Sequence, residues 1–379
     1  MKFNTKTIHA GQKPEETSGA VMPPIFQTST YVQEAPNVNK GYDYARVGNP
    51  TRSALEKLIA GLENTDQCAC FASGCASMDA VLKMFRPGDQ IIASDDLYGG
   101  TYRLFTKVFE PFGIDFTFVD MTDINNVKEA ATDDAKLLWI ETPTNPLLRI
   151  VDIEELTNFA HQNDILTVVD NTFASPYLQR PLDLGADMVL HSTTKYLGGH
   201  SDIIGGAVAT SKPNLMEKLR FQIKTTGAVP GPMDCYLTLR GIKTLSVRMK
   251  QAVENAKEVA SFLDNHPAVG QAIYPGLKSH KQHGIAKKQM KDFGAMVSFS
   301  LKDDSQEEAQ AFMSRTKIFA LAESLGGVES LISHPASMTH GSIPKEVREK
   351  AGLKDSLIRL SIGIEDSEDL VEDLDQAFK

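Results

Sequence analysis

The sequence predicts an α/β protein with a mostly parallel central sheet between helices, followed by a smaller α+β domain. Strand-like and helical stretches alternate between residues 68 and 210, which is typical of a parallel sheet with helices on both faces. Beyond about residue 265 the pattern changes, because 296–301 and 357–362 alternate apolar and polar residues as strands with one buried face do. We therefore expect a large domain at 47–240 and a second domain at 241–379.

Residues 1–46 are expected to form an irregular arm, because prolines interrupt the segment at four positions. The arm still carries several aromatic and aliphatic side chains, too many for a disordered tail, so we expect it to contact a neighbouring subunit. A helix is expected at 51–64 with Thr51 as its cap. A single long helix over 233–263, with Gly241 inside it, would link the two domains.

Composition excludes several classes of protein. The 379 residues carry a net charge of −10, which argues against nucleic acid or an anionic membrane as the main partner. No apolar run is long enough to span a membrane, and the N-terminus lacks the apolar core of a signal peptide, so we expect the cytoplasm. The four cysteines lack the paired spacing of a metal site, and no metal is expected.

Seven short apolar runs are predicted to be strands of the large sheet, at 68–72, 90–93, 115–119, 137–140, 166–169, 188–190 and 205–210. The most informative stretch is 166–200, where Asp170 follows one run and Lys195 follows the next. Ligands bind at the carboxyl ends of strands in open parallel sheets. A lysine that forms an imine and an acid that keeps a pyridine nitrogen protonated are what pyridoxal phosphate requires. A structural Asp–Lys salt bridge at a sheet edge is the alternative.

Other strand ends carry residues that suit the same cofactor. Ser73, Gly74 and Cys75 form a turn before a helix, where backbone N–H groups can bind an anion. Tyr98 follows the next strand and could stack on a planar ligand or pack as an ordinary core tyrosine. Asn145 stands between two prolines in a stiff loop.

Six motifs occur in an order that closely resembles the Cys/Met-metabolism family of pyridoxal-phosphate enzymes. They are YDYARVGNPTR at 42–52, ETPTNP at 141–146, VVDNTF at 168–173, HSTTKYLGGHSD at 191–202, AESLGGVESL at 322–331 and IRLSIGIED at 358–366. The resemblance covers nearly the whole chain. It implies the aspartate aminotransferase-like fold (fold type I) and a homotetramer built as a dimer of dimers.

The resemblance also implies the residues of the cofactor site. Lys195 would hold the cofactor and, with Tyr98, act in catalysis, while Asp170 would pair with the ring nitrogen. The remaining cofactor contacts would come from Gly74, Cys75, Ser192, Thr194, Asn145 and Thr172, and from Tyr44 and Arg46 of a neighbouring subunit.

A substrate site is implied beside the cofactor. Arg359 would clamp the substrate carboxylate as a bidentate partner, with Asn145 assisting. Ser324, Glu323 and Tyr44 would border the substrate, which is expected to be a small amino acid.

The implied reaction is α,γ-elimination of L-cystathionine to L-cysteine, 2-oxobutanoate and ammonia. The alternative is γ-replacement, in which O-succinyl- or O-acetylhomoserine and L-cysteine give cystathionine. A non-catalytic binding protein on the same fold is a remoter alternative. Two positions argue against other activities of the family. Methionine gamma-lyases usually carry cysteine where this chain has Gly100, and cystathionine beta-lyases tend to carry an aromatic residue near the position of Glu323.

Overall fold

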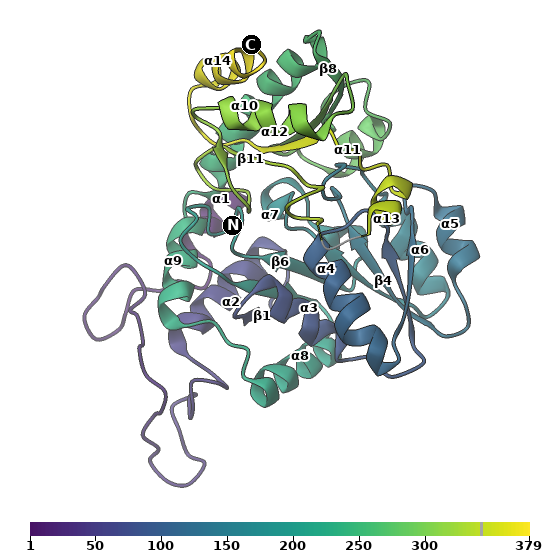
Figure 1. The fold of residues 1–379 in the computed structure, drawn as a ribbon. Coiled ribbons are helices and arrows are strands. Elements are labelled where there is room, and N and C mark those ends of the chain that lie inside the picture. Colours follow the sequence, from purple (N-terminus) through teal and green to yellow (C-terminus); the bar gives the residue numbers. More distant parts are fainter. Residues whose placement is uncertain (342–343) are drawn as a thin grey trace.

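The computed structural model describes residues 1–341 and 344–379 and contains two β-sheets (Figure 1). The larger sheet has seven strands, in the spatial order β1 (Cys68–Phe71), β7 (Gly206–Ala209), β6 (Met188–Ser192), β5 (Leu166–Asp170), β4 (Ala135–Glu141), β2 (Gln90–Ser94) and β3 (Asp115–Val119). From β6 to β3 every pair is parallel, as predicted. Strand β7 is antiparallel to both its neighbours, because the chain returns from β6 through a loop and not through a crossover helix.

Helices cover both faces of this sheet because its strands are apolar on both sides. In β4, Leu137 and Trp139 face one helical layer while Leu138 and Ile140 face the other. One layer contains α3 (Gly74–Leu82), α4 (Gly99–Leu104), the helical turns Phe105–Phe109 and Glu110–Phe112, and α8 (Pro213–Thr226). The other contains α2 (Pro50–Leu62), α5 (Ile124–Ala130), α6 (Ile153–Gln162), α7 (Ser175–Leu178), the 3-10 turn Pro181–Leu184 and α9 (Pro232–Ile242).

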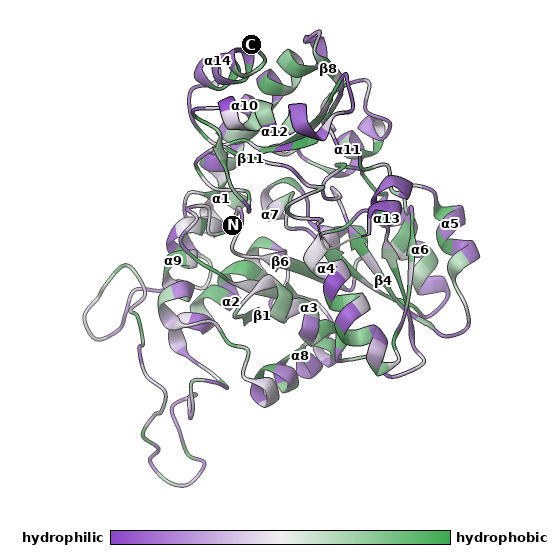
Figure 2. Cartoon of the chain, viewed as in Figure 1, coloured by the Kyte–Doolittle hydropathy of each residue, from purple (hydrophilic) through white to green (hydrophobic). Residues whose placement is uncertain are grey.

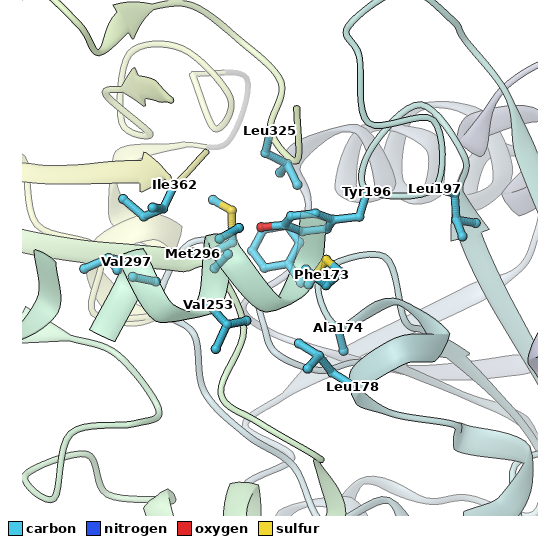
Figure 3. Packing of buried hydrophobic residues seen from close by; sticks show 14 of the residues in the cluster. Phe173, Ala174, Leu178, Tyr196, Leu197, Val253, Met296, Val297, Leu325 and Ile362 are labelled. Atoms are coloured by element: carbon cyan, nitrogen blue, oxygen red, sulfur yellow. The ribbon is translucent and has the colours of Figure 1, made fainter. Parts of the chain in front are cut away.

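The second sheet has five strands, in the order β10 (Ala320–Leu321), β11 (Leu331–Ser333), β12 (Leu357–Ser361), β9 (Met296–Leu301) and β8 (Val269–Ile273). Its helices are α10 (Leu245–Asn265), α11 (His283–Gln289), α12 (Gln306–Arg315), α13 (Lys345–Lys350) and α14 (Ser367–Ala377). One hydrophobic core continues from this sheet into the large domain. Figure 3 shows Phe173 and Tyr196 of the large domain packed beside Met296 and Leu325.

Three local expectations were wrong. Residues Phe3–His9 form a helix, α1, in the segment expected to be irregular. Helix α2 is capped by the side chain of Asn49, with Pro50 in its first turn, so Thr51 lies inside the helix. The expected single helix over 233–263 is two helices, α9 and α10, and α9 ends directly after Gly241. A Cβ at Gly241 would collide with the backbone of Gly198, so this glycine serves close packing between segments.

The residues between α1 and α2 extend away from the body of the chain as a long purple loop in Figure 1. This arm exposes apolar side chains, including Val21 at 85% and Val32 at 94% exposure. Figure 2 shows green strands in the larger sheet, whereas α13 and α14 on the outside are largely purple. Among the described residues, no helix is both long and apolar enough to cross a membrane.

Candidate active site

A cavity of about 270 Å³ opens at the carboxyl ends of the parallel strands, where the sequence predicted a site. We call it the central cavity. Most of the predicted site residues line it, and they come from both domains: Gly74, Cys75, Tyr98, Asn145, Asp170, Thr172, Ser192, Thr194, Lys195, Glu323, Ser324 and Arg359. Two predicted residues, Tyr44 and Arg46, do not line it.

Lys195 lies in the turn that follows β6, and its Nζ donates a hydrogen bond to Ser324 Oγ at 2.7 Å. Ser324 is held at φ +92°, a backbone conformation that non-glycine residues adopt at an energetic cost and that clusters at functional sites. Burial, followed by the charge of Arg359, lowers the pKa of Lys195 to about 8. The amine is therefore far easier to deprotonate than an ordinary lysine, as covalent chemistry requires.

Asp170 ends β5 and is almost fully buried, yet it forms no ion pair with Lys195 in the described part of the chain. The structural salt bridge considered as an alternative is therefore wrong. The Oδ1 atom of Asp170 instead accepts hydrogen bonds from the backbone N–H of Thr172 at 3.0 Å and from Thr172 Oγ1 at 2.5 Å. Burial raises the pKa of Asp170, and the two hydrogen bonds from Thr172 oppose this shift without cancelling it. A buried carboxylate facing a cavity in this way is suited to a cationic ring nitrogen.

The N-terminus of α3 lies at the 73–75 turn, where the sequence predicts an anion site. Ser73 caps the helix by accepting a hydrogen bond from the N–H of Ala76. The first-turn N–H groups at Gly74 and Cys75 have no partner within a helix, so they are available to an anion. Gly74 lies so close to β6 that a Cβ there would be 3.0 Å from Cβ of Ser192. Glycine at this position thus leaves room between the helix end and the Ser192 hydroxyl.

Tyr98 caps α4, and its ring lines the central cavity. Its backbone N–H donates to Oε2 of Glu141 at 3.0 Å. Glycine at 100 gives the ring its space, because a Cβ there would collide with the Tyr98 ring. Burial raises the pKa of Tyr98, so its hydroxyl is a proton donor at neutral pH.

Arg359 reaches the cavity from β12 of the second domain. It is 2% exposed, donates to Oδ1 of Asn145 at 2.9 Å and to the carbonyl of Ser324 at 3.1 Å, and its Nε has no hydrogen-bond partner in the described chain. Burial lowers its pKa to about 10, so it remains a cation at neutral pH. No carboxylate forms an ion pair with Arg359 among the described residues, and a buried guanidinium without one is suited to a carboxylate ligand.

Several cavity residues were not predicted from the sequence. Glu141 ends β4 beside Asp170, its register partner on β5, and burial, with the nearby Asp170, raises its pKa well above the usual range. Its position at a strand end was a signal that could have identified it. Thr339 reaches the cavity from a loop of the second domain, and no pattern in the sequence indicates that.

Tyr44 and Arg46 lie in a separate cavity, which we call the arm cavity, between the arm and the loop that follows α8. Arg46 lies over the Tyr44 ring, 5.4 Å from its centre, and donates to the carbonyl of Lys224. Within one chain these two residues therefore do not join the other predicted cofactor contacts.

The central cavity fits the cofactor that the sequence predicts. Lys195 supplies an amine of lowered pKa, Asp170 a buried carboxylate, and the start of α3 an anion site. These three groups match the aldehyde, the ring nitrogen and the phosphate of pyridoxal phosphate, respectively. The described residues offer no group of three or more His, Cys, Asp or Glu side chains that could hold a metal ion.

Comparisons with known proteins agree with this geometry. The model of the family described as "Cys/Met metabolism PLP-dependent enzyme" matches residues 4–379. A cystathionine gamma-lyase of Dictyostelium discoideum is 51% identical over 378 residues, covering 100% of this chain and 97% of that protein. A cystathionine beta-lyase of Lactococcus lactis subsp. cremoris is 52% identical over 377 residues, covering 100% and 99%.

Solved structures show the same likeness. The crystal structure of cystathionine gamma-lyase from Lactobacillus plantarum complexed with L-serine superposes with a TM-score of 0.98 at 47% identity, covering 100% of this chain and 98% of that one. The predicted fold type I architecture is thereby confirmed. The chain belongs to the Cys/Met-metabolism family of pyridoxal-phosphate-dependent enzymes, and pyridoxal 5'-phosphate is its cofactor.

Proposed function

We propose that this enzyme cleaves L-cystathionine by α,γ-elimination and, with the uptake of one water molecule, gives L-cysteine, 2-oxobutanoate and ammonia. The observation that carries the proposal is that Lys195 and Arg359 line the same cavity. Arg359 is a buried cation without a carboxylate partner in the described chain, and Lys195 is a lysine of lowered pKa. Together they suit an α-amino acid, whose carboxylate would bind Arg359 while its α-carbon faces Lys195.

The proposed roles of the side chains follow from their contacts. Pyridoxal phosphate, when bound, accepts the electron pair that the substrate releases as it loses its α-proton. The Nζ of Lys195, oriented by Ser324, takes that proton and can return it elsewhere on the substrate. Asp170 places its carboxyl group where the ring nitrogen would lie, and Tyr98 offers a protonated hydroxyl on the cavity wall.

The same cavity favours a substrate that is charged at both ends. Glu323 lines the cavity and is exposed at its mouth. A carboxylate there can attract the distal ammonium group of cystathionine. This acid occupies the position near which beta-lyases of the family tend to carry an aromatic residue, and it favours γ-elimination.

A second candidate is β-elimination, which cleaves the other C–S bond of cystathionine and, with one water molecule, gives homocysteine, pyruvate and ammonia. It is favoured by the similarity to proteins named cystathionine beta-lyase at 51% and 52% identity. Either bond can be cleaved at one lysine, depending on which carboxylate of the substrate binds Arg359.

One assay separates these reactions. The holoenzyme is incubated with L-cystathionine, and the keto acids are identified by mass spectrometry. We expect 2-oxobutanoate and cysteine in equal amounts. Pyruvate with homocysteine would instead establish the β-lyase. A parallel incubation with O-succinylhomoserine and cysteine tests γ-replacement, and rapid cystathionine formation there, without keto acid from cystathionine, would contradict the lyase proposal.

We also propose that the enzyme is a homotetramer in which each arm completes the site of a neighbouring copy. Tyr44 and Arg46 lie outside the central cavity of their own chain. The arm and neighbouring helices expose apolar side chains, among them Val32, Phe221 and Val247, as subunit interfaces do before assembly. Light scattering coupled to size-exclusion chromatography would give the mass. We place the enzyme in the cytoplasm, which is supported by four cysteines that are all free thiols.

A further inference from the structure

His340 connects the second domain to two loops that carry cavity residues. Its Nε2 lies 3.1 Å from the carbonyl oxygen of Leu97 and 3.0 Å from that of Asn145. The side chain is 2% exposed and belongs to the loop that also brings Thr339 to the cavity wall.

The hydrogen bonds determine which nitrogen carries the proton. Carbonyl oxygens only accept, so Nε2–H must donate and is shared between the two. Nδ1 lies 2.8 Å from Thr339 Oγ1, whose hydroxyl can donate to it. Burial, followed by the charge of Arg359, lowers the pKa of His340 to about 4. The imidazole therefore stays neutral, with a single N–H, throughout the neutral pH range.

The two carbonyls belong to segments that position Tyr98 and Asn145. Leu97 immediately precedes Tyr98, whose own N–H is bound by Glu141. The backbone at this turn is therefore held from two sides, by Glu141 of the large domain and by His340 of the second domain. The side chain of Asn145 accepts from Arg359, so His340 and Arg359 together hold that residue by its backbone and by its amide.

The loop that contains His340 packs tightly against the turn at the start of α4. A Cβ at Gly99 would collide with the carbonyl of Thr339. The loop containing His340 thus lies directly against the turn that begins α4, and little space is left for the turn to move.

We propose that His340 is a positioning residue: its single Nε2–H fixes the Leu97–Tyr98 turn and the Asn145 loop relative to each other, and so sets the Tyr98 ring against the cofactor. The inference rests on the proposed function in that Tyr98 and Asn145 are taken to contact the cofactor. It does not depend on which bond of the substrate is cleaved.

His334 provides a matched control, because it lies in the same loop and is equally buried. Its ring nitrogens contact Ser337 Oγ at 2.7 Å and the carbonyl of Asp355 at 2.7 Å. Neither partner lines the central cavity. Replacing His334 should disturb the loop without removing a bond to the Tyr98 turn or the Asn145 loop.

The test compares the holoenzymes of His340→Leu, His340→Gln and His334→Leu. Leucine removes the donor, whereas the glutamine amide can place an N–H near the original Nε2. Circular dichroism in the visible absorption band of the cofactor reports how the bound ring is held and needs no substrate. Thermal unfolding and steady-state kinetics with L-cystathionine, resolved into kcat and KM, complete the comparison.

For His340→Leu we expect an altered cofactor dichroism and a fall in kcat of about tenfold to hundredfold, the usual consequence of leaving buried carbonyls without a donor at a reacting site. His340→Gln should stay within about threefold of the wild type. His334→Leu should unfold at a lower temperature with unchanged dichroism.

An unchanged dichroism and kcat in His340→Leu would overturn the inference, as would an equal change of dichroism in His334→Leu. Should His340→Leu fail to fold, His340→Asn gives the same comparison, because its shorter amide cannot reach the two carbonyls. If the proposed substrate is wrong, all variants lack turnover of cystathionine, yet the dichroism still distinguishes them.

Discussion

The central cavity and the arm cavity contain residues predicted for one site, but they are built in different ways. Asp170 ends β5 and Lys195 follows the adjacent parallel strand β6, so the order of the strands alone brings them together. Tyr44 and Arg46 lie on an extended arm whose apolar side chains are largely exposed. The sheet therefore supplies the chemistry within a chain, whereas the arm has its predicted function only if a second copy is present.

The largest effect should come from the lysine of the central cavity. Lys195→Ala removes the amine that we propose holds the cofactor and moves protons, and we expect kcat to fall by about a thousandfold or more. The visible band of the covalently bound cofactor should also be lost. Lys278→Ala, which alters an exposed lysine that does not line the central cavity, should behave like the wild type. Retained turnover in Lys195→Ala would contradict the assignment of this cavity as the active site.

Removing the arginine of the arm cavity tests whether the arm acts in a neighbouring copy. Arg46→Ala should weaken cofactor binding about tenfold to hundredfold, the usual cost of losing a charge-assisted phosphate contact. When Arg46→Ala and Lys195→Ala chains are unfolded and refolded together, mixed dimers should form in which one of the two sites carries both native residues. Random mixing then restores about a quarter of the wild-type sites.

One outcome of this complementation experiment would contradict a role of Arg46 in the neighbouring copy. If Arg46 served the site of its own chain, a mixed dimer would hold no complete site, and activity would stay at the level of the separate variants. A mixture of Lys278→Ala and Lys195→Ala chains, in which half of all sites keep Lys195, controls for refolding.

The smallest effect concerns the pKa of Lys195, which is lowered by burial in the central cavity; the exposed arm provides no such burial. In the cofactor-free protein, burial lowers the pKa of Lys195 to about 8, so its ammonium predominates below that pH and its reactive amine above. The rate at which added pyridoxal phosphate forms its visible band should rise with pH and level off above about 8. A rate that continued to rise beyond pH 10, as for an exposed lysine, would show that burial does not activate this residue.

Much of the fold was predictable from the sequence because its physical signals are local. Short apolar runs ending at polar residues identified all seven strands of the larger sheet, and their parallel order followed from the helices between them. Helix α1 was missed because a seven-residue helix carries too little periodicity. The N-cap of α2 was misplaced because Asn49 and Thr51 are both acceptable caps. The antiparallel direction of β7 was not predicted, because an apolar run has no direction.

The sequence by itself therefore determined the chemistry: a lysine, an acid and an anion-binding turn at neighbouring strand ends, together with the family to which their motifs belong. Only the tertiary structure decided how these groups are held. It brought Thr339 into the cavity from the second domain, left Arg46 outside it, bound Arg359 to Asn145 and Ser324, and connected His340 to Leu97 and Asn145. These contacts join residues up to 243 positions apart, and no local pattern encodes them because they depend on how two separately formed sheets pack against each other.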